Sequence, residues 1–458
     1  MWIKRQEGYC LKEIAGVHYL LPYGQKVADQ RKGIVLNETG VFLWNELQET
    51  MTDEELAEKL VHYYSADGEA VNENQGEIQN QMQDQIQDQI RQDVKQFVQE
   101  LLSLGILQEC LRCAEDADDA TCVYLTKEPF AGCLEIAGMR IALYGSRDLI
   151  SSQFDAFLKD CASAQEKSQS ESQAKLQNEL QTESQIKMQI KMPVQMQIEI
   201  LQRTTPFHPN GKTLIRNEEL VVCENEQGYI ILFPSMNQIQ EAHMTRDGRF
   251  AQIYVKGLDK EKTKEELFHA IRHFFLFFAQ RQGFFAIHSA SILYRDQVWL
   301  FSGHSGMGKS THTNLWKEQF GTKIINGDLN LIGWSNGGQD NIGQSVDKPD
   351  SKEHPIVYGM PWCGTSGIAS TKSYPLGGIV LLGRSDNDHF ESLTNDQKIV
   401  RVMQRMISPV WTEDMLEANL KCAAKLAKEV PIYHLLCTKE PSAAYVMKAR
   451  IDKEDAQQ

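Results

Sequence analysis

The sequence has no apolar run long enough to cross a membrane. Its most apolar window, Phe274–Phe278, is far shorter than the roughly 18 residues that a membrane span requires. The opening residues, MWIKRQEGYCLKE, lack the apolar stretch of a secretory signal. The ten cysteines show no framework spacing, which excludes a small disulfide-stapled scaffold and favours reduced thiols. We therefore expect a cytoplasmic protein without a membrane partner.

Positive charge is also scarce. Lys and Arg number 47 against 62 Asp and Glu, so the formal net charge is -15. The average field of such a chain repels phosphate, and no nucleic-acid partner is expected. Any phosphate that binds must lie in a local cradle. The 458 residues, 41% of them hydrophobic, can form more than one core and predict about three domains.

The first hundred residues read as a small sheet followed by helices. Tyr9–Ile14 and Val17–Leu21 predict a hairpin, and Gly33–Leu36 predicts a third strand. Asn37 is a candidate N-cap for the next helix. The pair Thr52 and Glu55 has the spacing of a capping box that opens a second helix.

A Gln-rich segment interrupts this pattern at 75–92. Its apolar residues recur every four positions. Because an α-helix has 3.6 residues per turn, successive apolar side chains shift around the helix and do not form one buried face. We expect either a solvated extension of the third helix, which stops at Gly105, or a disordered insertion.

A second segment of biased composition covers 163–200. Alternation of apolar and polar residues over Ile186–Ile200 predicts a long edge strand interrupted at Pro193. The segment is either a partner-binding arm or a tolerated surface insertion, and the insertion is favoured. Beyond it, Thr263–Gln280 predicts an amphipathic helix, with Thr263 and Glu266 spaced as a capping box.

The strongest motif lies between an apolar strand and a helix. Val298–Ser302 predicts a buried strand, GHSGMGKS follows it, and THTNLWKEQF predicts a helix. In this setting a G-x-x-x-x-G-K-[ST] loop directs backbone N–H groups and a helix N-terminus at phosphate. We expect Lys309 to contact the phosphates of ATP and Ser310 to hold Mg²⁺. The expected nucleotide-binding residues are Gly303, His304, Ser305, Gly306, Met307, Gly308, Lys309, Ser310 and Thr311.

A carboxylate and a histidine flank this loop in sequence. Asp328 ends the apolar strand KIIN-G-D, where it could hold Mg²⁺ or accept a proton from an attacking hydroxyl. His288 lies fifteen residues before Gly303 and returns near the loop if the intervening residues form a hairpin. From its position alone, His288 reads as a core histidine.

Two cysteine-containing segments carry weaker signals. The segment Tyr358–Ile368 has the Gly, Pro and Trp content of an ordered functional loop, and Cys363 within it is either packed or reactive. Cys110 and Cys113 form a single CxxC, which fits an interdomain linker better than a metal site.

From about Phe285 to Leu382 the chain resembles the HPr kinase/phosphorylase family, which shares its nucleotide core with phosphoenolpyruvate carboxykinase. The features that carry the resemblance are His288, the loop GHSGMGKST and the strand that ends at Asp328. The resemblance implies a kinase with a compact mixed sheet, and it makes His288, Lys309 and Asp328 candidate catalytic residues. The family usually has two consecutive acids where this chain has Gly327-Asp328, so the general base is open and the Mg²⁺ role of Asp328 is the safer one.

From Gly8 to Leu107 the chain is similar to the PqqD family. The motifs GIVLNETGVFLW, DEELAEKLVHYY and DVKQFVQELLSLGIL carry this similarity. It implies a small winged-helix-like domain that binds the leader segment of a ribosomally made precursor peptide as an added strand. A separate peptide-modifying enzyme is a further expected partner.

These observations predict an α+β and α/β protein of three parts. They are a PqqD-like domain at 1–109, a variable part at 110–284 and a P-loop HPr kinase-like mixed-sheet domain at 285–458. The leading hypothesis is an ATP-dependent and Mg²⁺-dependent kinase that phosphorylates a Ser or Thr hydroxyl of a recruited peptide. The alternatives are an ATP-binding recognition module without catalysis and a small-molecule kinase.

Overall fold

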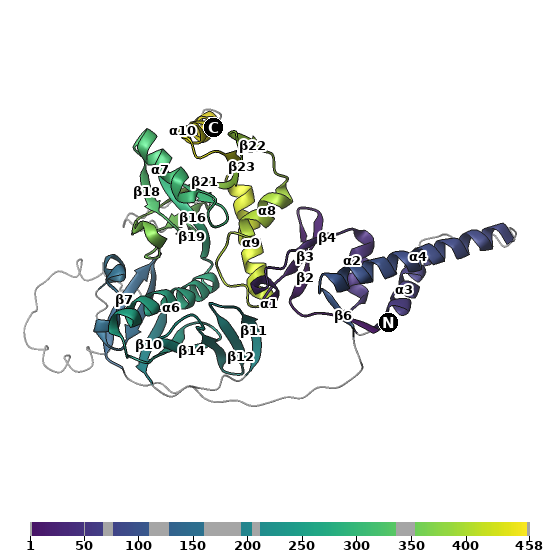
Figure 1. Ribbon diagram of the computed structural model, residues 1–458, viewed down its shortest axis with the longest axis horizontal. Helices are drawn as coiled ribbons and strands as arrows, with labels where there is room; N and C mark the ends of the chain where they lie inside the picture. Colours follow the sequence, from purple (N-terminus) through teal and green to yellow (C-terminus); the bar gives the residue numbers. More distant parts are fainter. Residues whose placement is uncertain are drawn as a thin grey trace, which may run out of the picture. The chain divides into compact units, whose positions relative to one another are not determined.

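The computed structural model describes residues 2–49, 51–66, 77–109, 128–159, 194–203, 211–335 and 353–455. The chain divides into two compact units (Figure 1). The first comprises Met1–Asp118 with Val410–Glu413, and the second comprises Asp119–Pro409 with Asp414–Gln458. Both units mix helices and strands, which agrees with the expected fold class. The winged-helix arrangement and the domain boundaries after 109 and 284 stay predictions.

The first unit has two small antiparallel sheets. In one, β1 (Trp2–Arg5) lies between β5 (Met51–Thr52) and β6 (Leu107–Glu109). The other has the order β2 (Tyr9–Ile14), β3 (Val17–Pro22) and β4 (Ile34–Leu36). Ala15 and Gly16 both have positive φ, as a two-residue hairpin turn requires, and the predicted hairpin is confirmed.

The helices of the first unit begin where the sequence predicts. Asn37 caps α2 (Glu38–Glu46) by accepting a hydrogen bond from Gly40 N–H. Thr52 and Glu55 form the reciprocal capping box of α3 (Asp53–Ala66). The helix α4 (Glu77–Ser103) includes most of the Gln-rich segment, and α1 (Gln25–Ala28) is a single turn.

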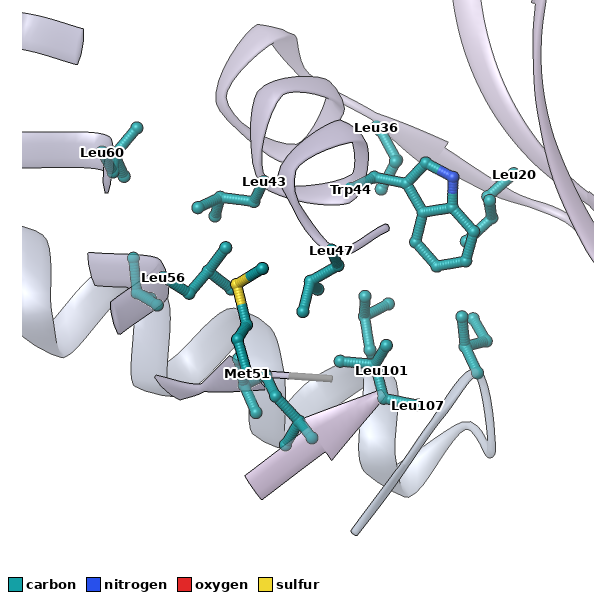
Figure 2. Close-up of a cluster of buried hydrophobic side chains, with 14 of the residues drawn as sticks. Leu20, Leu36, Leu43, Trp44, Leu47, Met51, Leu56, Leu60, Leu101 and Leu107 are labelled. Atoms are coloured by element: carbon teal, nitrogen blue, oxygen red, sulfur yellow. The ribbon is translucent and has the colours of Figure 1, made fainter. Parts of the chain in front are cut away.

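These helices and strands share one apolar core (Figure 2). Leu43 and Trp44 of α2 and Leu47, directly after it, pack with Leu56 and Leu101, and all of them are almost fully buried. Every buried member of the core lies between Ile3 and Leu107. This segment therefore contains a complete hydrophobic core.

A nine-stranded mixed sheet forms one part of the second unit. Its order is β11-β12-β13-β14-β15-β10-β8-β7-β9. The helix α6 (Lys260–Arg281) packs against β14 of this sheet and against β16 of a second sheet. The strands are β7 (Phe130–Ile136), β8 (Met139–Tyr144), β9 (Leu158–Lys159), β10 (Met196–Gln202), β11 (Lys212–Arg216), β12 (Val221–Asn225), β13 (Gly228–Leu232), β14 (Ile239–Thr245) and β15 (Phe250–Val255).

The second sheet of this unit has eight strands in the order β17-β16-β19-β20-β21-β23-β22, and β18 pairs with β16. The pairs β17–β21 and β21–β23 are parallel, so the sheet is mixed as expected. Its strands are β16 (Phe285–Tyr294), β17 (Gln297–Ser302), β18 (Lys323–Asn326), β19 (Leu329–Trp334), β20 (Pro355–Tyr358), β21 (Ser373–Arg384), β22 (His389–Glu391) and β23 (Ile432–Cys437). Its helices are α7 (Lys309–Phe320), α8 (Asn395–Met403), α9 (Glu413–Glu429) and α10 (Pro441–Asp455).

Two sequence-based expectations in the second unit are wrong. The strand β10 is not an edge strand, because it pairs in parallel with both β8 and β15, and Ile198 and Ile200 are buried. The rest of the predicted strand, 186–193, lies outside the described residues. Thr263 does not cap α6: Asp259 is the N-cap and accepts from Lys262 N–H.

Two further expectations concern the redox state of the cysteines and the absence of a membrane-spanning segment. Cys223, Cys363, Cys422 and Cys437 carry free thiols, whereas Cys133 is disulfide-bonded, so the expectation of reduced thiols fails at that position. Cys110 and Cys113 lie outside the described residues. Among the described helices, none is both long enough and apolar enough to span a bilayer.

Candidate nucleotide and phosphoryl-transfer site

The Gly-rich loop joins β17 to α7, as the sequence predicts. Gly306 and Gly308 have φ of 74° and 94°, conformations that a glycine adopts without strain. Gly308 is the N-cap residue of α7, so the positive end of the helix dipole lies at the loop. Ser310 and Thr311 in the first turn are exposed, whereas Lys309 is buried and its Nζ donates to Gly303 O at 3.2 Å.

His288 and Asp328 meet beside this loop. The hairpin of β16 and β17 pairs Ser289 with Ser302, which returns His288 to the start of the loop. Its Nε2 lies 3.4 Å from Asp328 Oδ1, and the two side chains are 38% and 37% exposed. Burial and the charge of Lys309 lower the pKa of His288 against the opposing effect of Asp328, so the imidazole is neutral at pH 7.

Lys309 belongs to the same electrostatic group. Burial lowers the pKa of its ammonium, and the Asp328 carboxylate acts in the opposite direction. The structure therefore brings together the three residues that the sequence singled out as catalytic, His288, Lys309 and Asp328. Their chemical roles stay predictions.

A buried amide holds the turn that carries Asp328. Asn326 is fully buried, and its Oδ1 accepts from the N–H groups of Asp328 and Leu329 at 2.9 and 3.0 Å. Its Nδ2 donates to the carbonyls of Met360 and Trp362. One side chain thus joins the end of β18 to the segment 359–367.

The segment 359–367 explains why a second acid is missing before Asp328. A Cβ at Gly327 would lie 2.1 Å from Ser366 Oγ and 3.1 Å from Cys363 O. Any side chain at 327 would collide with this segment, whose turn η4 (Gly364–Ser366) covers the position. Burial raises the pKa of the Cys363 thiol, which makes it a poor nucleophile at neutral pH.

Three arginines near the site had no signal in the sequence. Arg405 follows α8, and its backbone carbonyl accepts from His288 N–H at 2.9 Å. Its guanidinium lies against His304 of the loop, with Nη2 2.7 Å from Nε2, and it lowers the pKa of that histidine. Arg384, at the end of β21, donates to Gly306 O. Arg272 of α6 lies close enough for its charge to interact with Asp328 and His288.

The described residues contain no group of three or more His, Cys, Asp or Glu side chains that could hold a metal ion. A magnesium ion bound together with nucleotide needs fewer protein ligands, since phosphate oxygens and water complete its shell. Ser310 and Asp328 are the hydroxyl and carboxylate that fit this role.

Comparisons with known proteins give one family match and one structural match. Residues 27–107 match the family described as Coenzyme PQQ synthesis protein D (PqqD). None of the curated proteins matches the chain. Among solved structures, the Hpr(Ser) kinase/phosphatase from Coxiella burnetii matches with a TM-score of 0.20 and 8% identity, over 38% of this chain and 97% of that chain. A TM-score of this size carries no argument, so the case for a nucleotide site rests on the loop and its neighbours. The PqqD part of the expected architecture is confirmed: the segment 27–107 is a PqqD domain.

Proposed function

We propose that this protein is an ATP-dependent kinase that phosphorylates a Ser or Thr hydroxyl of a peptide recruited by its PqqD domain. The observation that carries the kinase half is the grouping of Lys309, His288 and Asp328 at a glycine-rich loop between a strand and a helix N-terminus. A loop of this kind cradles phosphate oxygens through its N–H groups.

The proposed reaction is phosphoryl transfer. The acceptor oxygen bonds to the γ-phosphorus of ATP, the bond from that phosphorus to the β,γ-bridging oxygen breaks, and ADP leaves. The proton of the hydroxyl passes to Asp328 or to the neutral His288, whose Nε2 lies 3.4 Å from the Asp328 carboxylate. Lys309 and the loop amides stabilise the charge of the transferred group. Arg405, beside His304, adds a second cation at the loop.

Magnesium fits the same residues. The Ser310 hydroxyl and the Asp328 carboxylate are hard oxygen ligands, and both are solvent-accessible. When bound, the ion neutralises phosphate charge.

The PqqD match supports the peptide half of the proposal. The strand β4 pairs with β3 and has no second partner strand among the described residues, so its other edge is available for an added strand. Val35 in this strand is 58% exposed. A cavity of 830 Å³ lies between α2 and α3, where Phe42 and Tyr63 offer apolar contact.

A second candidate function is a nucleotide-binding recognition module that presents a peptide to a separate modifying enzyme. The observation that favours it is the single carboxylate, because Ser366 occupies the space that a second acid at 327 would need. Under this function the loop binds ATP without transferring its phosphoryl group.

ATP turnover separates these functions. The full chain is incubated with Mg-ATP, with and without a precursor peptide encoded beside its gene, and phosphate incorporation is measured. A kinase incorporates phosphate into the peptide, and we expect Lys309→Met to abolish both this incorporation and tight ATP binding. ATP binding without incorporation supports the recognition module. Unchanged ATP affinity in Lys309→Met would refute the nucleotide site itself.

A further inference from the structure

An arginine without an ion pair among the described residues lines a cavity beside α6. A cavity of 520 Å³ is lined by α6 and by two loops of the nine-stranded sheet. Its lining includes Glu219, Lys262, His269, Arg272 and His273. Of these, Arg272 is the residue whose charge also interacts with Asp328.

The packing of α6 explains how Arg272 reaches the site. Phe268 and Phe275 both contact the Trp362 ring, with centroids 5.9 and 5.3 Å apart. Trp362 Nε1 also donates to Phe268 O at 2.8 Å. Residues 268, 272 and 275 share one helix face, so Arg272 lies on the face that Trp362 covers. Trp362 O in turn accepts from Asn326, which holds the Asp328 turn.

The guanidinium of Arg272 has no anionic partner among the described residues. Glu219 and Asp328 interact with its charge, yet neither forms an ion pair with it in the described structure. Arg272 is half-buried, and burial lowers the pKa of its guanidinium, with no ion pair among the described residues to offset that cost. Such a group has five N–H donors and a strong preference for carboxylate or phosphate.

The other cation of the lining, Lys262, pairs with Asp259 at 3.7 Å, and the remaining lining groups supply no positive charge. Glu266 is occupied, because it accepts from the N–H groups of Asn237, Gln238 and Ile239. Burial lowers the pKa of His269 and brings that of His273 to about 3, so both are neutral at pH 7. Arg272 is therefore the cation of the lining whose charge also interacts with Asp328.

We propose that this cavity binds the phosphoryl acceptor and that Arg272 holds an anionic group, a carboxylate or a phosphate, which the acceptor carries close to its reactive hydroxyl. This assignment of the cavity rests on the proposed function, which supplies the reaction. It adds the substrate class: an acceptor with a negative charge a few bonds from the hydroxyl. The anion would orient the hydroxyl toward Asp328 and His288.

Matched pairs of small acceptors test the assignment on the full chain with Mg-ADP present. N-acetyl-L-serine and N-acetyl-L-serinamide differ by the carboxylate, and glycerol 3-phosphate and glycerol differ by the phosphate. Affinities are measured by calorimetric or thermal-shift titration. We expect one anionic member to bind at least about tenfold more tightly than its neutral partner. The pair that shows this difference identifies the anion as a carboxylate or a phosphate.

Variants on α6 assign the effect to one side chain. Arg272→Gln should remove the preference for the anionic member, and Arg272→Lys should keep part of it, since the charge remains without the planar fork. Arg281→Gln is the control, because Arg281 lies on the same helix and pairs with Asp414. ADP affinity should not change in any of the three variants.

Two outcomes would overturn the inference. One is equal affinity for the anionic and the neutral member of each pair, or no binding of any probe. Either result would mean that the N–H groups of Arg272 bond to water and not to a substrate anion. The other is an anion preference that survives Arg272→Gln. Failure of the proposed function would appear elsewhere, as absent ATP binding or as normal ATP binding by Lys309→Met.

Discussion

The position of Gly327 offers the sharpest structural test of the site. In Gly327→Ala the new Cβ would lie 2.1 Å from Ser366 Oγ and 2.4 Å from Ser366 Cβ. No such contact is tolerated, so the segment 359–367 must move. Overpacking of this kind costs about 1–3 kcal/mol of unfolding free energy. Because Gly364 also lies against Asp328, we expect turnover to fall as well.

A second substitution separates this clash from other effects. Ser366→Gly removes the two atoms closest to the new methyl group and leaves Cys363 O at 3.1 Å, at the loss of hydrogen bonds to Cys363 O and from Ile368 N. These bonds contribute about 1 kcal/mol each. We expect Gly327→Ala to cost less stability in the double variant than it does alone, by a coupling of about 1–3 kcal/mol.

Urea unfolding of the four chains provides the measurement. Most of the tryptophans lie in the second unit, where Trp316 and Trp362 are buried, so fluorescence changes there are compared with those of Trp2 and Trp44 in the first unit, and midpoints are taken at constant denaturant slope. If the costs of the two substitutions simply add, to within about 0.5 kcal/mol, the clash does not exist and the structural account of the missing acid is wrong.

Three further predictions concern the metal, the pH dependence and the peptide. Asp328→Asn should lower turnover by about 10²- to 10⁴-fold with metal-free nucleotide affinity unchanged; near-normal Mg²⁺-dependent transfer would place the carboxylate elsewhere. His312 has a pKa of about 4 in the fold, so its contribution to stability is present above pH 6.5 and is lost as pH falls toward 4, at about 1.4 kcal/mol per unit. His312→Gln keeps an acceptor for Trp316 Nε1 and should flatten this slope in unfolding measurements from pH 7 to 4.5; an unchanged slope would contradict it. Residues 1–109 should fold alone and show amide shifts at β4 and α2 on titration with a leader peptide; no shifts at millimolar peptide would leave the domain without this role.

The parts of the site that local sequence determines were predictable. The strand, the Gly-rich loop and the helix of the phosphate cradle are contiguous, and each has its own signal in the chain. Asp328 was predictable because it ends an apolar strand. Its contact with His288 depended on a hairpin, which Arg295 and Asp296 close with positive φ. That turn is local too, so the sequence could indicate it.

The arginines could not be predicted, because long-range packing brings them to the site. Arg405 is 101 residues from His304 and reaches it because the chain after α8 runs along β16, where Ile287 pairs with Met406. Arg272 arrives on a helix that the sequence placed in a different domain. The wrong capping box has a similar cause: Glu266 is drawn to backbone N–H groups that lie 27 to 29 residues away, which no local pattern shows.

The way Asn326 is held explains how a single carboxylate can be positioned without a neighbouring acid. Ser291 Oγ accepts from Asn326 N–H and donates to Asn330 Oδ1, and Asn330 Nδ2 donates to Ser289, all within the buried interior. Each of these polar groups has a partner, so the network favours one geometry for the turn. Since Asn326 also bonds Met360 and Trp362, a displacement of the segment 359–367 is transmitted to Asp328 through the same amide. The Gly327→Ala clash should therefore reach the chemistry through hydrogen bonds that the substitution itself does not touch.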